Sequence, residues 1–239
     1  MAKPARPWTV LAPSPFEKLT PHLWRVEDIV PRMPLRRVMA VAKRTDGRLV
    51  VHNAICLPDA MMEELAAWGP VAYIVVPNPF HRLDAAAWKA RFPSAQIICP
   101  DGAKTKVAEI VPVDATFAEF QPDAVVSLHG LAGVRDQEGY MQITEPNATS
   151  LVVTDALFNM PHESGVKGFV LKYITASSGG PKCNRIARMM LIKDKPAFAA
   201  QLRALAELPQ LTRILVGHHE TITGDVATTL RNIAATLAP

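Results

Sequence analysis

The sequence of 239 residues predicts a layered α/β protein, and two patterns carry that prediction. Short apolar runs rich in Val and Ile are bounded by turn residues, as buried strands are. They alternate with segments whose apolar residues recur every three or four positions, as in amphipathic helices. Each half of the chain runs from strands into helices. Two sheets with helices on their outer faces accommodate this order.

The first half contains strand-like runs followed by an alternation of strand and helix. A turn at Thr45–Gly47 predicts that the second and third runs form a hairpin. A helix is expected at 58–68, where Gly69 and Pro70 stop it, and another at 85–92 with Asp84 as its N-cap. The expected strands are 23–26, 37–42, 48–52, 71–76 and 95–99.

The second half repeats the pattern with a helical end. Helices are expected at 196–208 and over a closing segment in which apolar residues keep a clean helical spacing (Val226, Leu230, Ile233 and Leu237). The expected strands are 124–128, 139–144, 150–154 and 211–216. No repeat or linker divides the chain, so we expect a single domain over 1–239, of which 1–20 form an N-terminal extension.

Composition narrows the class of protein. A hydrophobic content of 49% excludes a disordered chain, and no apolar run approaches the ~20 residues of a membrane-spanning helix. The net charge of +4 comes from scattered basic residues, and aromatic residues make up only 6%. We therefore expect a small-molecule substrate or ligand, with neither nucleic acid nor membrane as a partner. The N-terminus lacks the apolar stretch of a signal peptide, and the three cysteines form no paired framework, which favours the cytoplasm.

Polar side chains of the metal-ligating kind follow several predicted strands directly. Ligand sites form at such strand ends because rigid strands position the side chains there, and His with Asp is a common ligand set for Zn, Fe and Mn. Taken singly, each of these residues is more often a hydrogen-bonded structural group or a turn cap. The positions are His52 and Asn53, His81, His129, Asp155, and His218 with His219.

The order of these residues resembles that of the metallo-β-lactamase superfamily of hydrolases. In that superfamily a strand ends in His-x-His-x-Asp-His, a later His follows, then an Asp after a strand, then a final strand with Gly-His. The best-matched segments are Leu-Val-Val-Thr-Asp-Ala-Leu-Phe at 151–158 and Ile-Leu-Val-Gly-His at 214–218. The resemblance covers roughly 23–237 and implies a four-layer αββα sandwich.

The segment 77–84, Pro-Asn-Pro-Phe-His-Arg-Leu-Asp, departs from the superfamily's first motif. When His81 is aligned with the second His of that motif, Pro79 and Leu83 stand where a His and the Asp belong, and Asp84 falls on the final His. The usual two-metal site cannot then be complete. The sequence is similar to a divergent branch of the superfamily that carries the same Pro-Asn-x-x-His replacement.

The resemblance implies two alternative functions. In the first, one divalent metal (Zn, Fe or Mn) is held by His81, Asp155 and His218, and its activated water hydrolyses a small ester, lactone, thioester or phosphoester. Asp84 or His129 would then handle protons or supply a fourth ligand. In the second, the protein holds no metal, is not catalytic, and binds a ligand or partner in the old cleft. Residues 177–180, Ser-Ser-Gly-Gly, are expected to form a flexible loop near the site.

Overall fold

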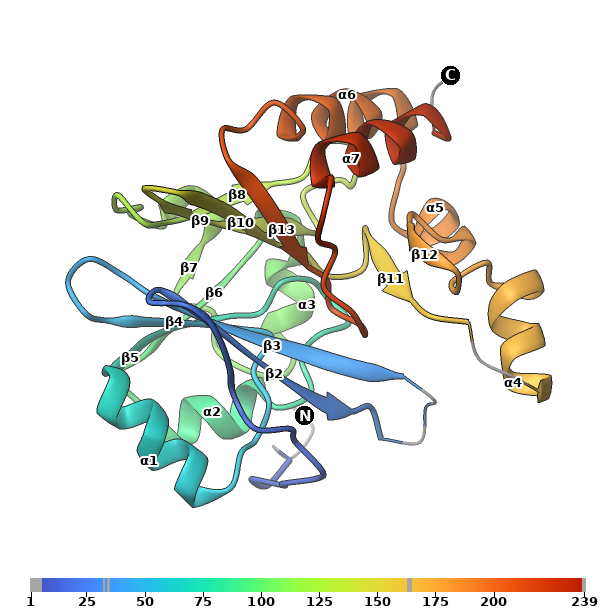
Figure 1. Cartoon of the computed structure of the whole chain (residues 1–239). Helices are drawn as coiled ribbons and strands as arrows, with labels where there is room; N and C mark the ends of the chain where they lie inside the picture. The colour runs from blue at the N-terminus through green and yellow to red at the C-terminus, as the bar shows by residue number, and fades with distance from the viewer. Residues whose placement is uncertain (1–5, 32, 34, 163–164, 238–239) are drawn as a thin grey trace.

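The computed structural model describes residues 6–31, 33, 35–162 and 165–237 (Figure 1). Within these residues the strands form a seven-stranded sheet, a four-stranded sheet and a separate two-stranded ribbon. The first sheet runs in chain order: β1 (Glu17–Thr20), β2 (Leu23–Ile29), β3 (Arg36–Lys43), β4 (Leu49–His52), β5 (Val71–Val75), β6 (Gln96–Cys99) and β7 (Ala115–Thr116). The second runs in the order β13 (Leu211–Leu215), β10 (Ala148–Val152), β9 (Gly139–Glu145) and β8 (Val126–Gly130). The ribbon pairs β11 (Phe158–Met160) with β12 (Gly180–Lys182).

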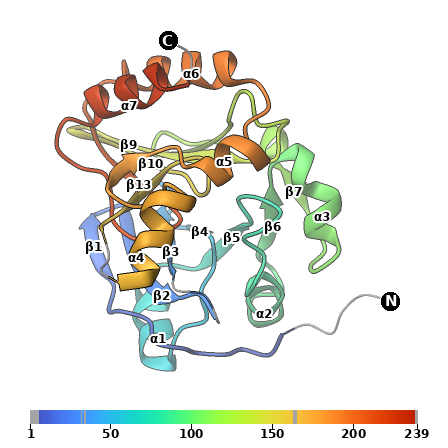
Figure 2. The same ribbon diagram turned by 90° about the vertical axis from the view of Figure 1, so that its right-hand side faces the viewer.

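Helices cover the outer faces of the two sheets, which face each other (Figure 1). Beside the first sheet lie α1 (Asp59–Trp68), α2 (Ala85–Arg91) and α3 (Lys104–Ala108), and beside the second lie α6 (Lys195–Leu205) and α7 (Val226–Ala235). On one side of the sheets, next to the β11–β12 ribbon, lie α4 (Gly165–Phe169), which continues as a π-helical turn over Val170–Ile174, and α5 (Arg185–Met190) (Figure 2). The predicted α/β class is confirmed.

The alternation of side chains along each strand separates three hydrophobic clusters. In β4, Val50 packs between the sheets while Val51 packs toward the helices of the first sheet. In β10, Val152 joins the cluster between the sheets and Leu151 the cluster under α6 and α7. Successive side chains of a strand point to opposite faces, so a strand buried on both faces reads as a continuous apolar run. This is why the sequence signalled these strands well.

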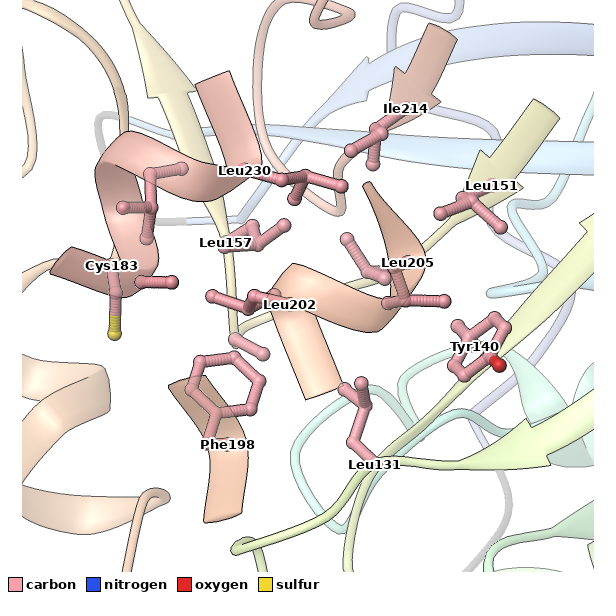
Figure 3. Close-up of a cluster of buried hydrophobic side chains, with 14 of the residues drawn as sticks. Leu131, Tyr140, Leu151, Leu157, Cys183, Phe198, Leu202, Leu205, Ile214 and Leu230 are labelled. Carbon is pink, nitrogen blue, oxygen red and sulfur yellow. The ribbon is translucent and has the colours of Figure 1, made fainter. Parts of the chain in front are cut away.

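The helices over the second sheet bury a regular apolar stripe. In α6, Phe198, Leu202 and Leu205 point into the cluster at helical spacing (Figure 3). Asp194 caps the helix by accepting a hydrogen bond from the backbone N–H of Ala197 at 2.9 Å. Removing one such buried leucine costs about 2–5 kcal/mol, because a cavity is left behind. The predicted helices at 58–68, 196–208 and 226–237 are observed within three residues of their expected ends.

The N-terminal segment is part of the fold rather than an extension from it. Glu17–Thr20 forms β1, which pairs antiparallel with β2. Further upstream, Trp8 packs against Trp88 of α2 with ring centroids 5.5 Å apart, and its indole N–H donates to the carbonyl oxygen of Leu57 at 2.9 Å. The end of the expected N-terminal extension over 1–20 therefore contributes a strand to the first sheet, and 1–5 lie outside the described residues. No described helix is long and apolar enough to cross a membrane.

Candidate metal centre

Two of the three predicted metal ligands meet because they follow neighbouring parallel strands. β10 and β13 are parallel, with Val152 opposite Leu215, so their carboxyl ends lie at the same edge of the sheet. Asp155 and His218 each come three residues after these partners. The strand ends therefore bring the carboxylate and the imidazole together without any contribution from sequence proximity.

The third ligand arrives from the first sheet. His81 lies in the loop after β5. The two sheets are joined at this edge, because the backbone N–H of Val38 in β3 donates to the carbonyl oxygen of Gly217, the residue before His218, at 3.0 Å. A Cβ atom at Gly217 would lie 3.0 Å from the backbone of Thr154 and 3.2 Å from the His81 ring. Glycine before His218 thus permits the close approach of the three segments.

The two imidazoles converge on one carboxylate oxygen of Asp155. His81 Nε2 lies 3.1 Å from Asp155 Oδ1, and His218 Nε2 lies 3.3 Å from the same oxygen. In a tetrahedral zinc site with bonds of about 2.0–2.1 Å, neighbouring ligand atoms are about 3.3 Å apart. The spacing of these donors therefore fits a single small divalent ion. Among the residues that the structure describes, this is the one group of three or more His, Cys, Asp or Glu whose ligand atoms lie within 4.8 Å of one another.

Hydrogen bonds on the far side of each ring determine what the converging nitrogens offer. The amide of Asn53 donates to the carbonyl oxygen of Val38 at 2.7 Å, so its Oδ1 faces His81 Nδ1 at 3.0 Å. His218 Nδ1 faces the carbonyl oxygen of Arg36 at 2.8 Å. Both partners are acceptors, so each Nδ1 carries the proton and donates.

A neutral ring of this tautomer presents a lone pair at Nε2. Two such lone pairs directed at a carboxylate oxygen repel it unless a proton or a metal cation lies between them. Metal-ligating histidines characteristically donate their other N–H to a carbonyl or carboxylate group, which fixes the ring orientation. The donor set of His81, Asp155 and His218 thus fits a metal ion.

The second oxygen of Asp155 is held by a residue that sequence reasoning did not assign to the site. Asn78 Nδ2 lies 2.9 Å from Asp155 Oδ2, 3.1 Å from Thr154 Oγ1 and 3.0 Å from an oxygen of Glu138. Its own Oδ1 accepts the backbone N–H groups of Phe80 and His81. One buried amide therefore ties the His81 loop to the Asp155 loop.

Glu138 is the other unexpected member of this network. Its carboxylate is fully buried and accepts the backbone N–H groups of Thr154 and Ala156, one on each side of Asp155. Burial, with the nearby charge of Asp155, raises the pKa of Glu138 to about 7. The run Arg135–Glu138 is entirely polar and reads as solvated surface, so the sequence contains no signal for this role.

The charges of the cluster favour an ionised Asp155. Burial alone would raise the pKa of this carboxyl, but the charge of His81 and hydrogen bonds from both imidazoles outweigh it and lower the pKa well below its ordinary value. Burial would lower the pKa of His218, but its hydrogen bond to Asp155 prevails and raises it. In the metal-free protein a proton therefore serves as the positive charge in the cluster.

Asp84, predicted to handle protons, does not join the cluster. Its side chain is fully buried and lies 2.7 Å from a guanidinium nitrogen of Arg37 and 3.2 Å from one of Arg6, and it also accepts the N–H of Cys56. Asp84 does occupy the predicted N-cap position of α2, but its side chain makes no capping hydrogen bond there. The two guanidinium groups neutralise the charge of this buried carboxylate, which is a structural role.

His129, the other predicted proton-handling residue, lies on the opposite face of its strand from the intersheet cluster. Val126 and Leu128 of β8 pack between the two sheets, so the side chain of His129 points to the outer face. There it stacks on Tyr140 at 4.9 Å and lies 2.7 Å from the Ser127 hydroxyl. The predicted strand ended at 128; the observed one continues to Gly130, and strand alternation fixes this orientation.

The remaining candidates have structural surroundings. His52 is buried, and burial lowers its pKa to about 3, so its ring is neutral. Of the segment 177–180, Ser177 and Ser178 are buried, and Gly180 begins β12. The segment is thus partly built into the ribbon beside the site, and Ser177 lines a cavity that also reaches Asp155 and His218.

Comparison with known proteins assigns the fold. No family model and no curated protein matches the sequence. Among solved structures, the chain is similar to the metallo-β-lactamase FIM-1 from Pseudomonas aeruginosa in a mono-zinc form, with 11% identity, a TM-score of 0.61 and coverage of 97% of this chain and 100% of that one. It is also similar to metallo-β-lactamases from Erythrobacter litoralis (15% identity, TM-score 0.61, coverage 93% and 96%) and Pontibacter korlensis (11%, 0.58, 92% and 98%). The chain has the metallo-β-lactamase fold.

Proposed function

We propose that the protein is a hydrolase that uses one divalent metal ion, held by His81, Asp155 and His218, to cleave a small ester, lactone, thioester or phosphoester. The observation that carries the proposal is the shared orientation of the two histidines. Both turn a protonated Nδ1 outward to an acceptor, and both point Nε2 at a single carboxylate oxygen.

A bound Zn, Mn or Fe(II) ion would supply a water molecule whose pKa is lowered to about 7. The chain's own residues fix the geometry in which that happens. Asn53 and the Arg36 carbonyl hold the two rings, and Asn78 holds Oδ2 of Asp155 so that Oδ1 faces them. Phe158 stacks on His218 at 5.4 Å and keeps water from that face of the ring.

Single-ion chemistry is supported by what surrounds the cluster. Asp84 is neutralised by two arginines and His129 faces the other side of its sheet, so neither is placed to complete a second site. One solved structure with this fold is described as a mono-zinc form, which shows that a single ion is compatible with the fold. The proposed partner is a small molecule rather than a nucleic acid or membrane. The proposed location is the cytoplasm. The free thiols of all three cysteines support it, because thiols stay reduced in that compartment.

The test is metal content, measured by elemental analysis after incubation with Zn, Mn or Fe(II) and removal of excess metal. We expect about one equivalent per chain, lost in Asp155→Ala and in His218→Ala. His129→Ala is the matched control, because it removes a histidine that lies outside the cluster, and it should keep the metal. Absence of metal from the wild-type protein under every condition would overturn the proposal in favour of a metal-free binding protein.

A further inference from the structure

An apolar cavity of about 350 Å³ opens beside the candidate metal centre, with Asp155 and His218 in its wall. This volume is within the range of small-molecule sites. Its apolar wall comes from separate parts of the chain: the segment between β2 and β3, the loop after β5, β11 and α5. The main contributors are Met33, Leu35, Phe80, Phe158, Ile186 and Met190.

The polar side chains in this cavity, apart from the cluster, are already bonded to one another. Asn184 caps α5 by accepting the N–H of Ala187, and its amide donates to the Ser177 hydroxyl at 3.1 Å. Ser177 in turn donates to Thr175 Oγ1 at 2.9 Å. A ligand in the cavity therefore finds strong polar partners at the end formed by Asp155 and His218, and hydrocarbon along the rest.

Apart from the cluster itself, the described lining residues carry no positive charge, since they include no lysine or arginine. Arg36 and Arg185, which adjoin lining residues in the sequence, are engaged elsewhere: Arg36 pairs with Glu27 at 2.7 Å, and Arg185 donates to the carbonyl oxygen of Tyr173 at 3.1 Å. Sites for phosphate groups normally present Arg or Lys, or a set of free backbone N–H groups. This cavity therefore disfavours a phosphoester.

The mouth of the cavity exposes large apolar side chains. Phe80, Ile186 and Met190 are 62%, 47% and 58% exposed. Contact of these side chains with water is unfavourable, and a ligand that extends from the cluster to the mouth would cover them. Binding of an apolar group is thus favoured by the free energy gained when these side chains are removed from water.

We propose that this cavity receives the apolar part of the substrate, so that among the classes considered the protein acts on carboxylic esters, thioesters or lactones with an uncharged alkyl or aryl group. This assignment rests on the proposed hydrolase function, since the cavity places such a group next to His218 and Asp155. It predicts discrimination by hydrocarbon length and against phosphoesters.

Binding can be tested without any metal or turnover. In metal-free protein, straight-chain alcohols from 1-butanol to 1-octanol should displace the neutral fluorophore N-phenyl-1-naphthylamine. Affinity should rise about fourfold per added methylene, the fold-change that corresponds to transfer of one CH₂ out of water. Equal affinity across the series would overturn the assignment.

Two neighbouring methionines on α5 provide a matched pair. Met190 lines the cavity, whereas Met189 is 78% exposed and outside it. Met190→Asp should weaken 1-octanol binding by roughly five- to tenfold, and Met189→Asp, with the same change of charge on the same helix, should leave it unchanged. Ile186→Asp tests the same rim independently if Met190→Asp lowers the melting temperature. Equal effects of the Met189 and Met190 substitutions would contradict the proposal.

Turnover separates this assignment from the proposed function. With metal-loaded protein, kcat/KM for p-nitrophenyl esters should rise from acetate to octanoate, and p-nitrophenyl phosphate should not be cleaved. Ester cleavage without any chain-length preference, or preferred cleavage of the phosphate, would overturn the substrate class and leave the hydrolase intact. Chain-length-dependent alcohol binding with no turnover of either substrate would overturn the hydrolase and support the apolar specificity of the cavity.

Discussion

Substitution of Asn78 should lower the stability of the metal-free protein more than substitution at most other positions. Asn78 is fully buried and bridges the loop after β5 to Asp155 and Glu138. In Asn78→Ala the two carboxylates lose a hydrogen-bond donor that water cannot easily replace. The backbone N–H groups of Phe80 and His81 lose their acceptor at the same time.

The expected loss can be worked out from these contacts. Hydrogen bonds to charged groups contribute about 1.5–3 kcal/mol each, and a buried partner left unsatisfied costs its full desolvation. Two carboxylates are affected, so we expect the free energy of unfolding to fall by about 3–6 kcal/mol. For a chain of this size, that corresponds to a decrease in Tm of about 6–24 °C.

The assay is urea unfolding of metal-free protein, in which the midpoint should fall while the m-value stays constant. Asn232→Ala is the matched control, because Asn232 is exposed on α7 and its loss should change stability by less than about 0.5 kcal/mol. A loss below about 1 kcal/mol in Asn78→Ala would refute the reasoning, because it would mean that the amide does not satisfy Asp155 and Glu138. Metal affinity should also fall about 10- to 100-fold, as for other residues that orient a ligand.

Three other predictions follow from the described contacts. Glu138, whose pKa is raised to about 7 from its ordinary 4.5, binds more protons folded than unfolded between those values, so its contribution to the free energy of unfolding should fall as pH rises from about 4.5 to 7. Glu138→Gln should remove that contribution, so that the urea midpoint rises more steeply with pH than in the wild type, and an unchanged pH dependence would contradict the assignment. Trp8→Ala should cost about 1–2 kcal/mol of unfolding free energy by removing an aromatic contact and the hydrogen bond to Leu57; no measurable loss would show that the N-terminal segment does not pack on the domain. Burial raises the pKa of the thiols of Cys56, Cys99 and Cys183 to about 11. The thiol reagent 5,5′-dithiobis(2-nitrobenzoate) at pH 8 should therefore label none of them in native protein and all three in guanidinium chloride. A thiol that reacts fast in native protein would contradict this prediction.

The sheets were predictable where burial determines the sequence. The strand predicted at 71–76 is Val71–Val75, and the helix predicted at 58–68 is Asp59–Trp68. Elements at the margins were not predictable. Glu17–Thr20 has no apolar alternation and becomes a strand because β2 offers it an edge to pair with. The six-residue helix α5 is too short to show periodicity, and its exposed methionines reflect the cavity beside it.

The candidate site was predictable to the extent that strand ends define it. Asp155 and His218 come three residues after β10 and β13, and His81 follows β5 after a short loop. The parallel pairing of β10 with β13 guarantees that two of them meet. The residues that hold these ligands gave no such signal. Glu138 lies 16 residues before Thr154 and 60 after Asn78, so its contacts depend on tertiary structure alone.

The polar side chains of the segment 77–84 have defined partners. Asn78 directs its amide donor at Asp155. Asp84 buries its carboxylate against Arg37 and Arg6, and a metal could take it only by displacing both ion pairs, which costs several kcal/mol for buried charges. The charged and polar groups of the site are thereby confined to one donor set, while hydrocarbon lines the cavity beside it. Under the proposed function, a site arranged in this way would separate reactivity from recognition: the ligand cluster would determine which bond is attacked, and the apolar wall would determine which molecule is admitted.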